Sequence, residues 1–546
     1  MSTRLLLRLL GFGALALLLR LALLAGVLDD PTIGLQVDEA QYWGWSRELA
    51  WGYYSKPPGI AALIALSTAI GGDEVIGVRW LAMAVQVAAG VVLGLLAHDL
   101  ARSVWPGQAD RARRAAVWAT LIALSNPIAG LLGLVATTDA PLLLCWTLAA
   151  RALWRLQHTG RLVDGLGLGL WLGLGLLSKY TMAALLPGLL WWLWRRRHDG
   201  HGLPGQPATG RAPALALALV LTTLMLLPHL LWNAQTGWPT LHHTAEITVQ
   251  AGPPDARSAL AVLGALAGWL GGQWLMSGPL WLLLWLRWRR RLPAGAALPP
   301  AVRELLLALT VPLLVIGAAQ ALNAKAQINW TAPAMQGLVL ALALWLAPAG
   351  RRPLRRAAGG IVALHLLLVS VLPLVGTVLR GSGLHGDDMP PPRALDLWAR
   401  MRGWTPALQA LAPAARAPLA RGAVLIGADR TLISHGRHAW RDLPGADWHA
   451  WRPDSRRPPV DHYQLVAGWP ATASAADRQR PLLIVSHGET LPPDWLAWLE
   501  PPVRLAGSRT AQGADRTLAL TLWQARLRPE PAAAPTSTAL EPLESR

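Results

Sequence analysis

The chain has 546 residues, of which 53% are hydrophobic and only 15% are charged. This composition excludes an ordinary soluble enzyme and indicates a polytopic membrane protein that carries a soluble part. The formal net charge of +18 does not indicate nucleic-acid binding, because the arginines fall in short clusters between long apolar runs. Cys145 is the only cysteine, which excludes an intrachain disulfide and a cysteine-based metal site.

Eleven segments are apolar and long enough to cross a bilayer, which needs about 20 residues in a helix. They are predicted at residues 7–28, 78–99, 115–134, 139–156, 163–178, 180–195, 212–232, 266–286, 304–322, 333–349 and 358–379. Arg20 lies inside the first segment, where a charge is costly and must face protein, water or a phosphate. The small residues of the Gly-Leu alternation at Gly165–Gly175 predict close helix packing and not a nucleotide site.

The arginine clusters orient these segments. With a cytoplasmic N-terminus, every dense cluster between helices falls on the cytoplasmic side, as the positive-inside rule requires. The clusters are Arg111, Arg113 and Arg114; Arg195, Arg196 and Arg197; Arg289, Arg290 and Arg291; and Arg351, Arg352, Arg355 and Arg356. An odd number of spans then places the first loop, about 29–77, and everything after about residue 380 on the outer side.

The fold class that follows is mainly α, with a small α/β domain after the membrane region. The predicted division is a transmembrane domain at 1–380, a soluble outward domain at 381–527 and a disordered tail at 528–546. Short β-like runs at Ala423–Ile426 and Leu482–Val485 support the α/β assignment of the soluble domain.

Lysine is rare in this chain and has an informative distribution. Lys56, Lys179 and Lys325 are the only three lysines against 46 arginines, and all three fall at outward ends of predicted spans. One interpretation is a codon composition that favours arginine. The other is that a compact ammonium is needed there to meet a phosphate, for which Lys56 and Lys179 are the stronger candidates.

Acidic residues occur at the same side. Asp38 and Glu39 are adjacent just past the first span, and their mutual repulsion predicts that at least one has a proton, a cation or a substrate hydroxyl as partner. Ordinary loop acidity is the simpler alternative. Asp139 begins the fourth span, and a helix N-cap and a functional carboxylate are both compatible with its position.

Two outward loops add polar and aromatic groups. His242 and Glu246 would share a helix face and could hold a metal, although two ligands are weak evidence. The run Asn323–Trp330 is polar enough to bind a sugar through Asn329 and to stack on it through Trp330, with loop solvation as the alternative. The predicted substrate-binding set is Tyr42, Tyr54, Asp139, Tyr180, His243, Lys325, Asn329 and Trp330.

Several motifs, taken in order, resemble one family. Asp38-Glu39-Ala40-Gln41-Tyr42-Trp43, Tyr53-Tyr54-Ser55-Lys56-Pro57-Pro58, Thr138-Asp139-Ala140-Pro141, Ser178-Lys179-Tyr180-Thr181 and Asn329-Trp330-Thr331-Ala332-Pro333-Ala334 are similar to the bacterial relatives of the dolichyl-phosphate-mannose protein mannosyltransferases. That group includes the transferase that adds aminoarabinose to lipid A. The resemblance covers most of the membrane region.

The resemblance implies a GT-C glycosyltransferase of the bacterial inner membrane, which moves a sugar from a polyprenyl-phosphate carrier to a lipid, glycan or protein acceptor on the periplasmic side, with inversion. It implies that Asp38 is the catalytic base with support from Glu39, and that Lys56 and then Lys179 bind the donor phosphate. Some relatives have an acidic residue before this lysine that helps to hold a metal, whereas this chain has Ser55. A divalent cation is the one cofactor left open, with no metal ligand assigned.

Two other functions compete with this one. A transporter or lipid-linked sugar flippase predicts charges near the middle of spans and an inverted repeat, whereas the polar residues here gather at one side. A non-enzymatic envelope scaffold would leave the stretch from Asp38 to Gly59 without a task. The transferase is therefore the favoured function, and the sequence does not name its sugar or its acceptor.

Overall fold

A computed structural model describes residues 2–198, 211–249, 258–277, 298–323, 327–348, 352–381 and 390–529. The chain divides into two compact units. The first comprises Met1–Gly26 and Trp45–Leu372, and the second comprises Val27–Gly44 and Pro373–Arg546. The first unit ends at Leu372 and residues 27–44 join the second, so the predicted division at residue 380 stays a prediction. The predicted tail at 528–546 lies outside the described residues from 530 onward.

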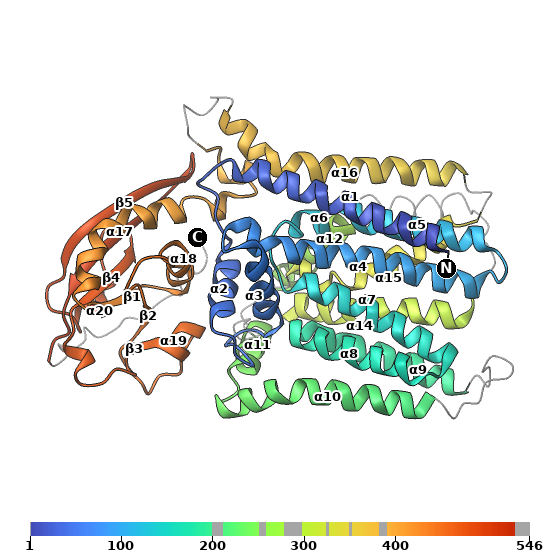
Figure 1. Cartoon of the computed structure of the whole chain (residues 1–546), viewed down its shortest axis with the longest axis horizontal. Coiled ribbons are helices and arrows are strands. Elements are labelled where there is room, and N and C mark those ends of the chain that lie inside the picture. The colour runs from blue at the N-terminus through green and yellow to red at the C-terminus, as the bar shows by residue number, and fades with distance from the viewer. Residues whose placement is uncertain are drawn as a thin grey trace. The chain divides into compact units, whose positions relative to one another are not determined.

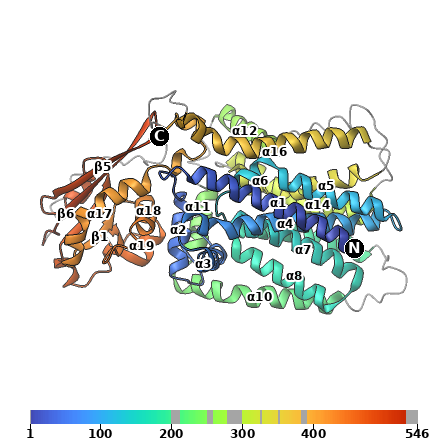
Figure 2. The same ribbon diagram turned by 45° about the horizontal axis from the view of Figure 1, so that its top comes forward.

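The first unit consists of helices (Figures 1 and 2). They are α1 (Thr3–Leu28), α3 (Gly59–Gly71), α4 (Val75–Val104), α5 (Ala109–Ser125), α6 (Pro127–Leu132), α7 (Asp139–Thr159), α8 (Leu162–Ser178), α9 (Leu185–His198), α10 (Arg211–Gln235), α11 (Pro239–Val249), α12 (Ala259–Ser277), α14 (Pro300–Asn323), α15 (Ala334–Leu346) and α16 (Arg352–Gly381), with the 3-10 helices η1 (Tyr180–Ala184) and η4 (Ile328–Thr331). The first residues of α1 through Gly26 and those of α16 through Leu372 belong to this unit.

Each of the eleven predicted spans overlaps a helix. Five of the described helices, α1, α4, α10, α14 and α16, are long and apolar enough to cross a membrane. The predicted span 115–134 is interrupted, because Asn126 ends α5 and then accepts a hydrogen bond from the Ala129 amide (2.9 Å) to start α6, with Pro127 in its first turn. The segment predicted as the first outward loop, 29–77, contains the helices α2 (Val37–Arg47) and α3.

Close packing of α8 on α10 confirms the interpretation of the Gly-Leu alternation. The two helices run side by side in both views (Figures 1 and 2). A Cβ on Gly165 would lie 2.3 Å from the Ala214 carbonyl oxygen, and one on Gly169 would lie 2.6 Å from that of Ala218. Only glycine permits this approach, so these residues serve helix packing.

Arginine contacts show that two of the predicted cytoplasmic loops share one end of the helical unit. Arg114, in the first turns of α5, donates from Nε to the Ala347 carbonyl after α15 (2.5 Å). Arg355, near the start of α16, donates to the Pro348 carbonyl (2.7 Å). Because α15 ends beside Arg114 and begins five residues after Asn329, Asn329 lies at the opposite end.

The second unit is an α/β domain. Its helices are α17 (Trp404–Ala420), α18 (Arg430–Ala439), α19 (His462–Ala467) and α20 (Pro493–Leu496), with short 3-10 turns at Arg393–Leu395, Ala399–Met401 and Asp477–Gln479. Its strands are β1 (Val424–Gly427), β2 (Trp448–Arg452), β3 (Gly468–Pro470), β4 (Leu482–His487), β5 (Val503–Gly513) and β6 (Arg516–Ala525).

The six strands form one sheet in the order β3-β2-β1-β4-β6-β5. Strands β3, β2, β1 and β4 are parallel, and β6 and β5 extend the sheet as an antiparallel hairpin. The predicted runs at Ala423–Ile426 and Leu482–Val485 are the two central strands β1 and β4, whose residues are fully buried until His487. Burial on both faces explains why these runs are continuously apolar instead of alternating.

Candidate functional site

Three motifs that are far apart in the sequence meet at one carboxylate. Lys179, which follows α8 in extended backbone, donates from Nζ to Asp139 Oδ1 at 2.6 Å. Asn329, in η4, donates from Nδ2 to Asp139 Oδ2 at 3.0 Å. The Asp139 and Lys179 side chains are only 9% and 13% exposed, so this is a buried ion pair with a hydrogen-bonded amide.

The position of Asp139 corrects one expectation. Thr138 occupies the N-cap of α7, and Asp139 is the first residue of the helix. The Asp139 carboxylate therefore does not cap its own helix but contacts two other segments. A structural helix cap does not need a lysine 40 residues away, so the cross-segment role is the one that this geometry supports.

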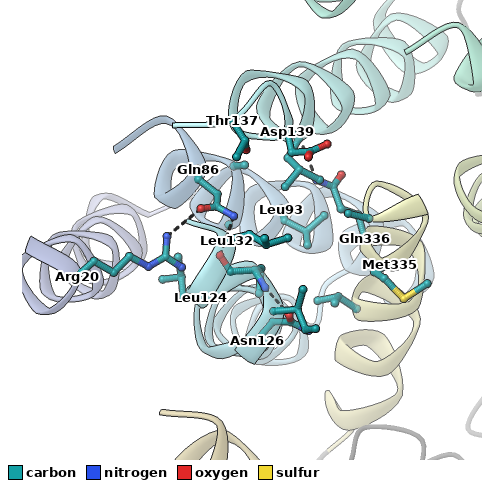
Figure 3. Close-up of a pocket in the computed structure, with 18 residues that line it drawn as sticks. Arg20, Gln86, Leu93, Leu124, Asn126, Leu132, Thr137, Asp139, Met335 and Gln336 are labelled. Carbon is teal, nitrogen blue, oxygen red and sulfur yellow. Dashed lines mark hydrogen bonds between the residues drawn. The ribbon is translucent and has the colours of Figure 1, made fainter. Parts of the chain in front are cut away.

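Asp139 also lines a cavity inside the helical unit, drawn in Figure 3. The cavity has about 810 Å³ of empty space, part of which is open to solvent. Its walls are aliphatic except for a few polar groups, namely Arg20, Gln86, Asn126, Thr137, Asp139 and Gln336. In Figure 3, Arg20 comes from α1, Gln86 from α4 and Gln336 from α15, so distant helices contribute these groups.

The Lys56 loop is held against helices of the same unit. The Trp51 carbonyl accepts a hydrogen bond from His229 Nδ1 in α10 (2.7 Å), and the Tyr53 carbonyl accepts one from the Thr240 hydroxyl in α11 (2.8 Å). The Tyr54 ring lies 5.3 Å from the ring of His243. The structure thus brings together Tyr54 and His243, two residues of the predicted substrate-binding set.

The Lys56 motif also approaches the Lys179 motif. Gly59, which follows Lys56-Pro57-Pro58, packs so closely on the end of α8 that a Cβ would lie 2.7 Å from the Leu177 carbonyl oxygen and 2.9 Å from Ser178 Cα. Lys56 itself is half-buried. The two segments that carry the predicted phosphate-binding lysines are therefore in contact.

His229 is a site residue that the sequence interpretation missed. Its Nδ1 must carry the proton, because it faces the Trp51 carbonyl, so Nε2 accepts a hydrogen bond from the Tyr180 hydroxyl at 2.6 Å. One neutral imidazole thus links the Lys56 loop to the residue after Lys179. A histidine next to Pro228 inside an otherwise apolar helix is the signal that could have identified it.

In the second unit, Asp38 and Glu39 occupy the first turn of α2 and have different partners. Gln36 and Glu39 form a capping box: the Asp38 amide donates to Gln36 Oε1 (2.6 Å), and the Gln36 amide donates to Glu39 Oε2 (2.8 Å). Glu39 is 1% exposed. Its carboxylate stabilises the start of α2, and the supporting catalytic role expected for it stays a prediction.

Asp38 points to the α/β domain. Arg430, the first residue of α18, donates from Nη1 to Asp38 Oδ1 (3.0 Å) and to Gln41 Oε1 (2.8 Å). Burial acts to lower the pKa of Arg430, but the Asp38 carboxylate outweighs it and raises that pKa above its ordinary value. Asp38 is 46% exposed and so remains accessible while it is paired.

The neighbour of Arg430 is also paired. Asp429 caps α18 by accepting from the Leu432 amide (2.9 Å) and forms an ion pair with His487 at the end of β4 (2.7 Å). Burial acts to raise the pKa of Asp429, but the hydrogen bond and the charge of His487 outweigh it and lower that pKa. Asp429 and His487 follow the adjacent strands β1 and β4, so the sheet fixes the end of α18 that carries Arg430.

A buried ion cluster holds the segment before α2 in the second unit. The fully buried Arg402 guanidinium pairs with Asp30 and with Asp396, and Arg380 pairs with Asp30 at 2.6 Å. Ile33 forms an antiparallel bridge with Arg402. Burial acts to raise the pKa of Asp30, but the bonds from Arg380 and Thr32 and the charge of Arg402 hold that pKa well below its usual range.

The remaining described residues of the predicted substrate-binding set form no hydrogen bond or ion pair with the Asp139 carboxylate. Tyr42 is buried in α2, Trp330 is half-buried in η4, and Lys325 lies outside the described residues. His243 lies 4.0 Å from Glu246, and the suggested pairing of His242 with Glu246 stays a prediction. Within the described ranges, no group of three or more histidine, cysteine, aspartate or glutamate side chains could hold a metal ion.

Comparison with known proteins identifies relatives of this chain. The family model for dolichyl-phosphate-mannose-protein mannosyltransferase matches residues 55–232. The lipid A galacturonosyltransferase RgtD of Rhizobium johnstonii is 30% identical over 348 residues, which are 62% of this chain and 66% of that protein. The undecaprenyl phosphate-alpha-4-amino-4-deoxy-L-arabinose arabinosyl transferase of Pseudomonas aeruginosa is 34% identical over 181 residues, 31% of each protein. The chain thus spans slightly less than two thirds of the first relative and about a third of the second.

The fold has a solved counterpart. The crystal structure of ArnT from Cupriavidus metallidurans bound to undecaprenyl phosphate matches with a TM-score of 0.54 and 16% identity, covering 94% of this chain and 97% of that one. At this identity the match establishes the fold alone. Apolar helices of spanning length and this fold define a polytopic membrane protein with the fold of ArnT. Over part of its length, the chain is similar to glycosyltransferases of the bacterial protein-mannosyltransferase and lipid A aminoarabinose transferase type.

Proposed function

We propose that this protein is a membrane glycosyltransferase that moves a sugar from a polyprenyl-phosphate carrier to a lipid acceptor such as lipid A. The observation that carries the proposal is that Lys179 and Asn329, from two of the family-like motifs, both bond Asp139 of a third motif, whose side chain lines a cavity. Two relatives of the chain are named for transfer to lipid A or for an undecaprenyl-phosphate sugar donor.

The proposed reaction is a single displacement at the anomeric carbon. An acceptor oxygen attacks that carbon, the bond from the carbon to the phosphate oxygen breaks, and the polyprenyl phosphate leaves with the electron pair. Asp38 accepts the proton that the acceptor hydroxyl loses, a contribution of roughly 10² to 10⁴ in rate for a general base. The anomeric configuration inverts because there is one displacement.

Fixed cations stabilise the charge that develops on the leaving phosphate. Lys56 is the first candidate for this role and Lys179 the second, and the contact between their segments at Gly59 supports a shared task. Lys179 already has Asp139 as a counterion, so its contribution to the phosphate requires that the ammonium use its remaining two N–H donors.

Arg430 is proposed to hold Asp38 in position, because the guanidinium donates to one carboxylate oxygen and leaves the side chain half exposed. Asp38 and Arg430 belong to the same compact unit, which gives the α/β domain a part in the chemistry.

We also propose the orientation that the arginines indicate. The bundle end with Arg114 and Arg355 is cytoplasmic, and the end with Asp139, Lys179 and Asn329 is periplasmic. The N-terminus is then cytoplasmic, and the α/β domain lies in the periplasm, where the acceptor would be met.

The test is sugar transfer by the full-length protein in lipid vesicles, with radiolabelled polyprenyl-phosphate sugars and a bacterial membrane extract as acceptor source. Asp38→Asn and Lys56→Ala should each lower the transfer rate by about 10² or more. Matched controls are Asp447→Asn and Arg456→Ala, which alter side chains that are each 91% exposed and should leave the rate unchanged. Normal transfer by both site variants would refute the assigned roles, and absence of any transfer by wild type with movement of labelled lipid across the vesicle would favour a flippase.

A further inference from the structure

Arg20 is a buried cation for which the proposed reaction has no use so far. It lies within α1 and is 3% exposed. Its Nη1 donates to Gln86 Oε1 at 3.3 Å, and no carboxylate of the described residues lies within 4 Å of it. Burial of an uncompensated charge inside a membrane bundle is costly, so an anionic ligand is the expected partner.

The guanidinium is held in place by its neighbour. Gln86 donates from Nε2 to the Ala129 carbonyl (2.8 Å), which fixes the amide and directs Oε1 to Arg20. The contact is tight, since a Cβ on Gly133 would lie 1.9 Å from Gln86 Oε1 and 2.9 Å from Arg20 Nη1. A single amide oxygen uses one of the five guanidinium N–H groups, which leaves four donors for a ligand.

Arg20 lines two cavities at once. One is the cavity that reaches Asp139 (Figure 3). The other has about 770 Å³ of open space and is bounded by residues of α1, α5 and α16, two of which, α1 and α16, run alongside each other in Figure 1. Its walls are aliphatic or aromatic except at Arg20 and Ser125, and include Leu19, Leu366 and Val369.

Ser125 provides an independent indication of a ligand. Its side chain is 1% exposed, and its hydroxyl has no hydrogen-bond partner among the described residues. A buried hydroxyl without a partner costs free energy unless something outside the chain accepts its proton. An otherwise apolar cavity thus presents two donors, one charged and one neutral, and no acid.

We propose that Arg20 and Ser125 bind the phosphate of the polyprenyl carrier, with its hydrocarbon chain in the aliphatic cavity between α1, α5 and α16. The inference rests on the proposed function for the identity of the lipid. A phosphate matches the planar guanidinium fork and accepts from a hydroxyl as well. Aliphatic walls beside the donors favour a phosphate on a long hydrocarbon chain over free inorganic phosphate.

This role differs from that proposed for Lys56. Arg20 binds the carrier before and after transfer, so its loss should weaken carrier binding and raise the KM for the donor with a small change in kcat. Loss of a cation that acts on the leaving group in the transition state should instead lower kcat. The cavity that joins Arg20 to Asp139 gives the phosphate and its sugar a route from this binding site toward Lys56 and Lys179, where the same phosphate becomes the leaving group.

The test measures binding of polyprenyl phosphate, and of the uncharged polyprenol of the same length, to the full-length protein in nanodiscs. Wild type should prefer the phosphate at least about tenfold, as expected for a charge-assisted bond. Arg20→Gln should remove most of that preference and Arg20→Lys should retain part of it. The control Arg355→Gln removes an arginine of the same unit that lines neither cavity and should leave the preference unchanged.

Two further variants distinguish a loss of phosphate binding from a loss of folding. Ser125→Ala is a small change that leaves no new cavity of consequence, and it should weaken phosphate binding about threefold to tenfold. Leu19→Trp should weaken binding of phosphate and alcohol alike, because it fills the aliphatic cavity. An unchanged preference for phosphate in folded Arg20→Gln and Ser125→Ala would overturn the proposal, as would an Arg20-dependent preference for phosphatidic acid over polyprenyl phosphate. Since no sugar transfer is needed, these outcomes are separate from failure of the proposed reaction.

Discussion

The Asp139–Lys179 pair allows a structural ion pair to be separated from a functional one. Removing one member of a buried pair costs about 3–5 kcal/mol in unfolding free energy, because the other charge is left without compensation. The loss of unfolding free energy in Lys179→Met should be at the lower end of this range, since Asp139 keeps its hydrogen bond from Asn329 (3.0 Å). Asp139→Asn should fall at the upper end, because it leaves an ammonium that is only 13% exposed without a counterion.

The double variant Asp139→Asn/Lys179→Met removes both charges. Its unfolding free energy should return to within about 1 kcal/mol of wild type, because replacing both partners leaves no uncompensated charge. If Lys179 stabilises the leaving phosphate, transfer should nevertheless stay reduced by about 10² or more. Stability is measured by thermal unfolding in detergent and transfer by the radiolabel assay.

Two results would refute this reasoning. Recovery of both stability and transfer in the double variant would show that the pair is structural and that Lys179 does not contact the phosphate. Near-normal stability in Asp139→Asn alone would show that the Lys179 ammonium is not confined by the carboxylate at 2.6 Å.

Two further predictions concern the residues that position the site. His229→Ala should lower the transfer rate about tenfold or more, because the His229 imidazole joins the Lys56 loop to Tyr180. Limited proteolysis near Lys56 should become faster. Unchanged rates of transfer and of proteolysis would show that His229 does not hold the Lys56 loop. Arg402→Met should destabilise the second unit by about 3–5 kcal/mol. The pKa of Asp30 is lower in the folded protein than in the unfolded chain, so ionised Asp30 stabilises the fold at pH values above its unfolded pKa, and this stabilisation is lost as the pH falls through its folded pKa. Without Arg402, the loss of stability on acidification should begin at a higher pH. An unchanged acid unfolding curve would contradict this prediction.

The sequence predicted much of the helical architecture because apolar length is a direct requirement of the bilayer. It was less accurate where local chemistry interrupts an apolar run. Asn126 and Pro127 break one predicted span, and both are ordinary signals of a helix start, yet the surrounding hydrophobicity concealed them. The central strands at Val424–Gly427 and Leu482–His487 were recognisable because a parallel strand buried on both faces is continuously apolar.

The site was predicted as a set of motifs and not as a set of contacts. Asp139, Lys179 and Asn329 were each selected for chemical type, but hydropathy contains no information on which helix ends meet. His229 was missed because a single histidine inside a helix is usually a core residue, and only its two partners show its role. Arg430 was missed because nothing local distinguishes it from the many other arginines of the chain.

The adjacent carboxylates of the first motif show how a short sequence can carry two tasks. Neighbouring residues on a helix project about 100° apart, so Asp38 and Glu39 do not share a partner. Glu39 turns back to the Gln36 amide and is buried, whereas Asp38 meets Arg430 and remains half exposed. The repulsion expected between two adjacent acids is thus relieved by separate partners. The same arrangement fixes Asp38, the proposed base, on a capped helix whose preceding segment is held by Arg402. The position of its carboxylate therefore depends on the α/β domain and on the capping box together.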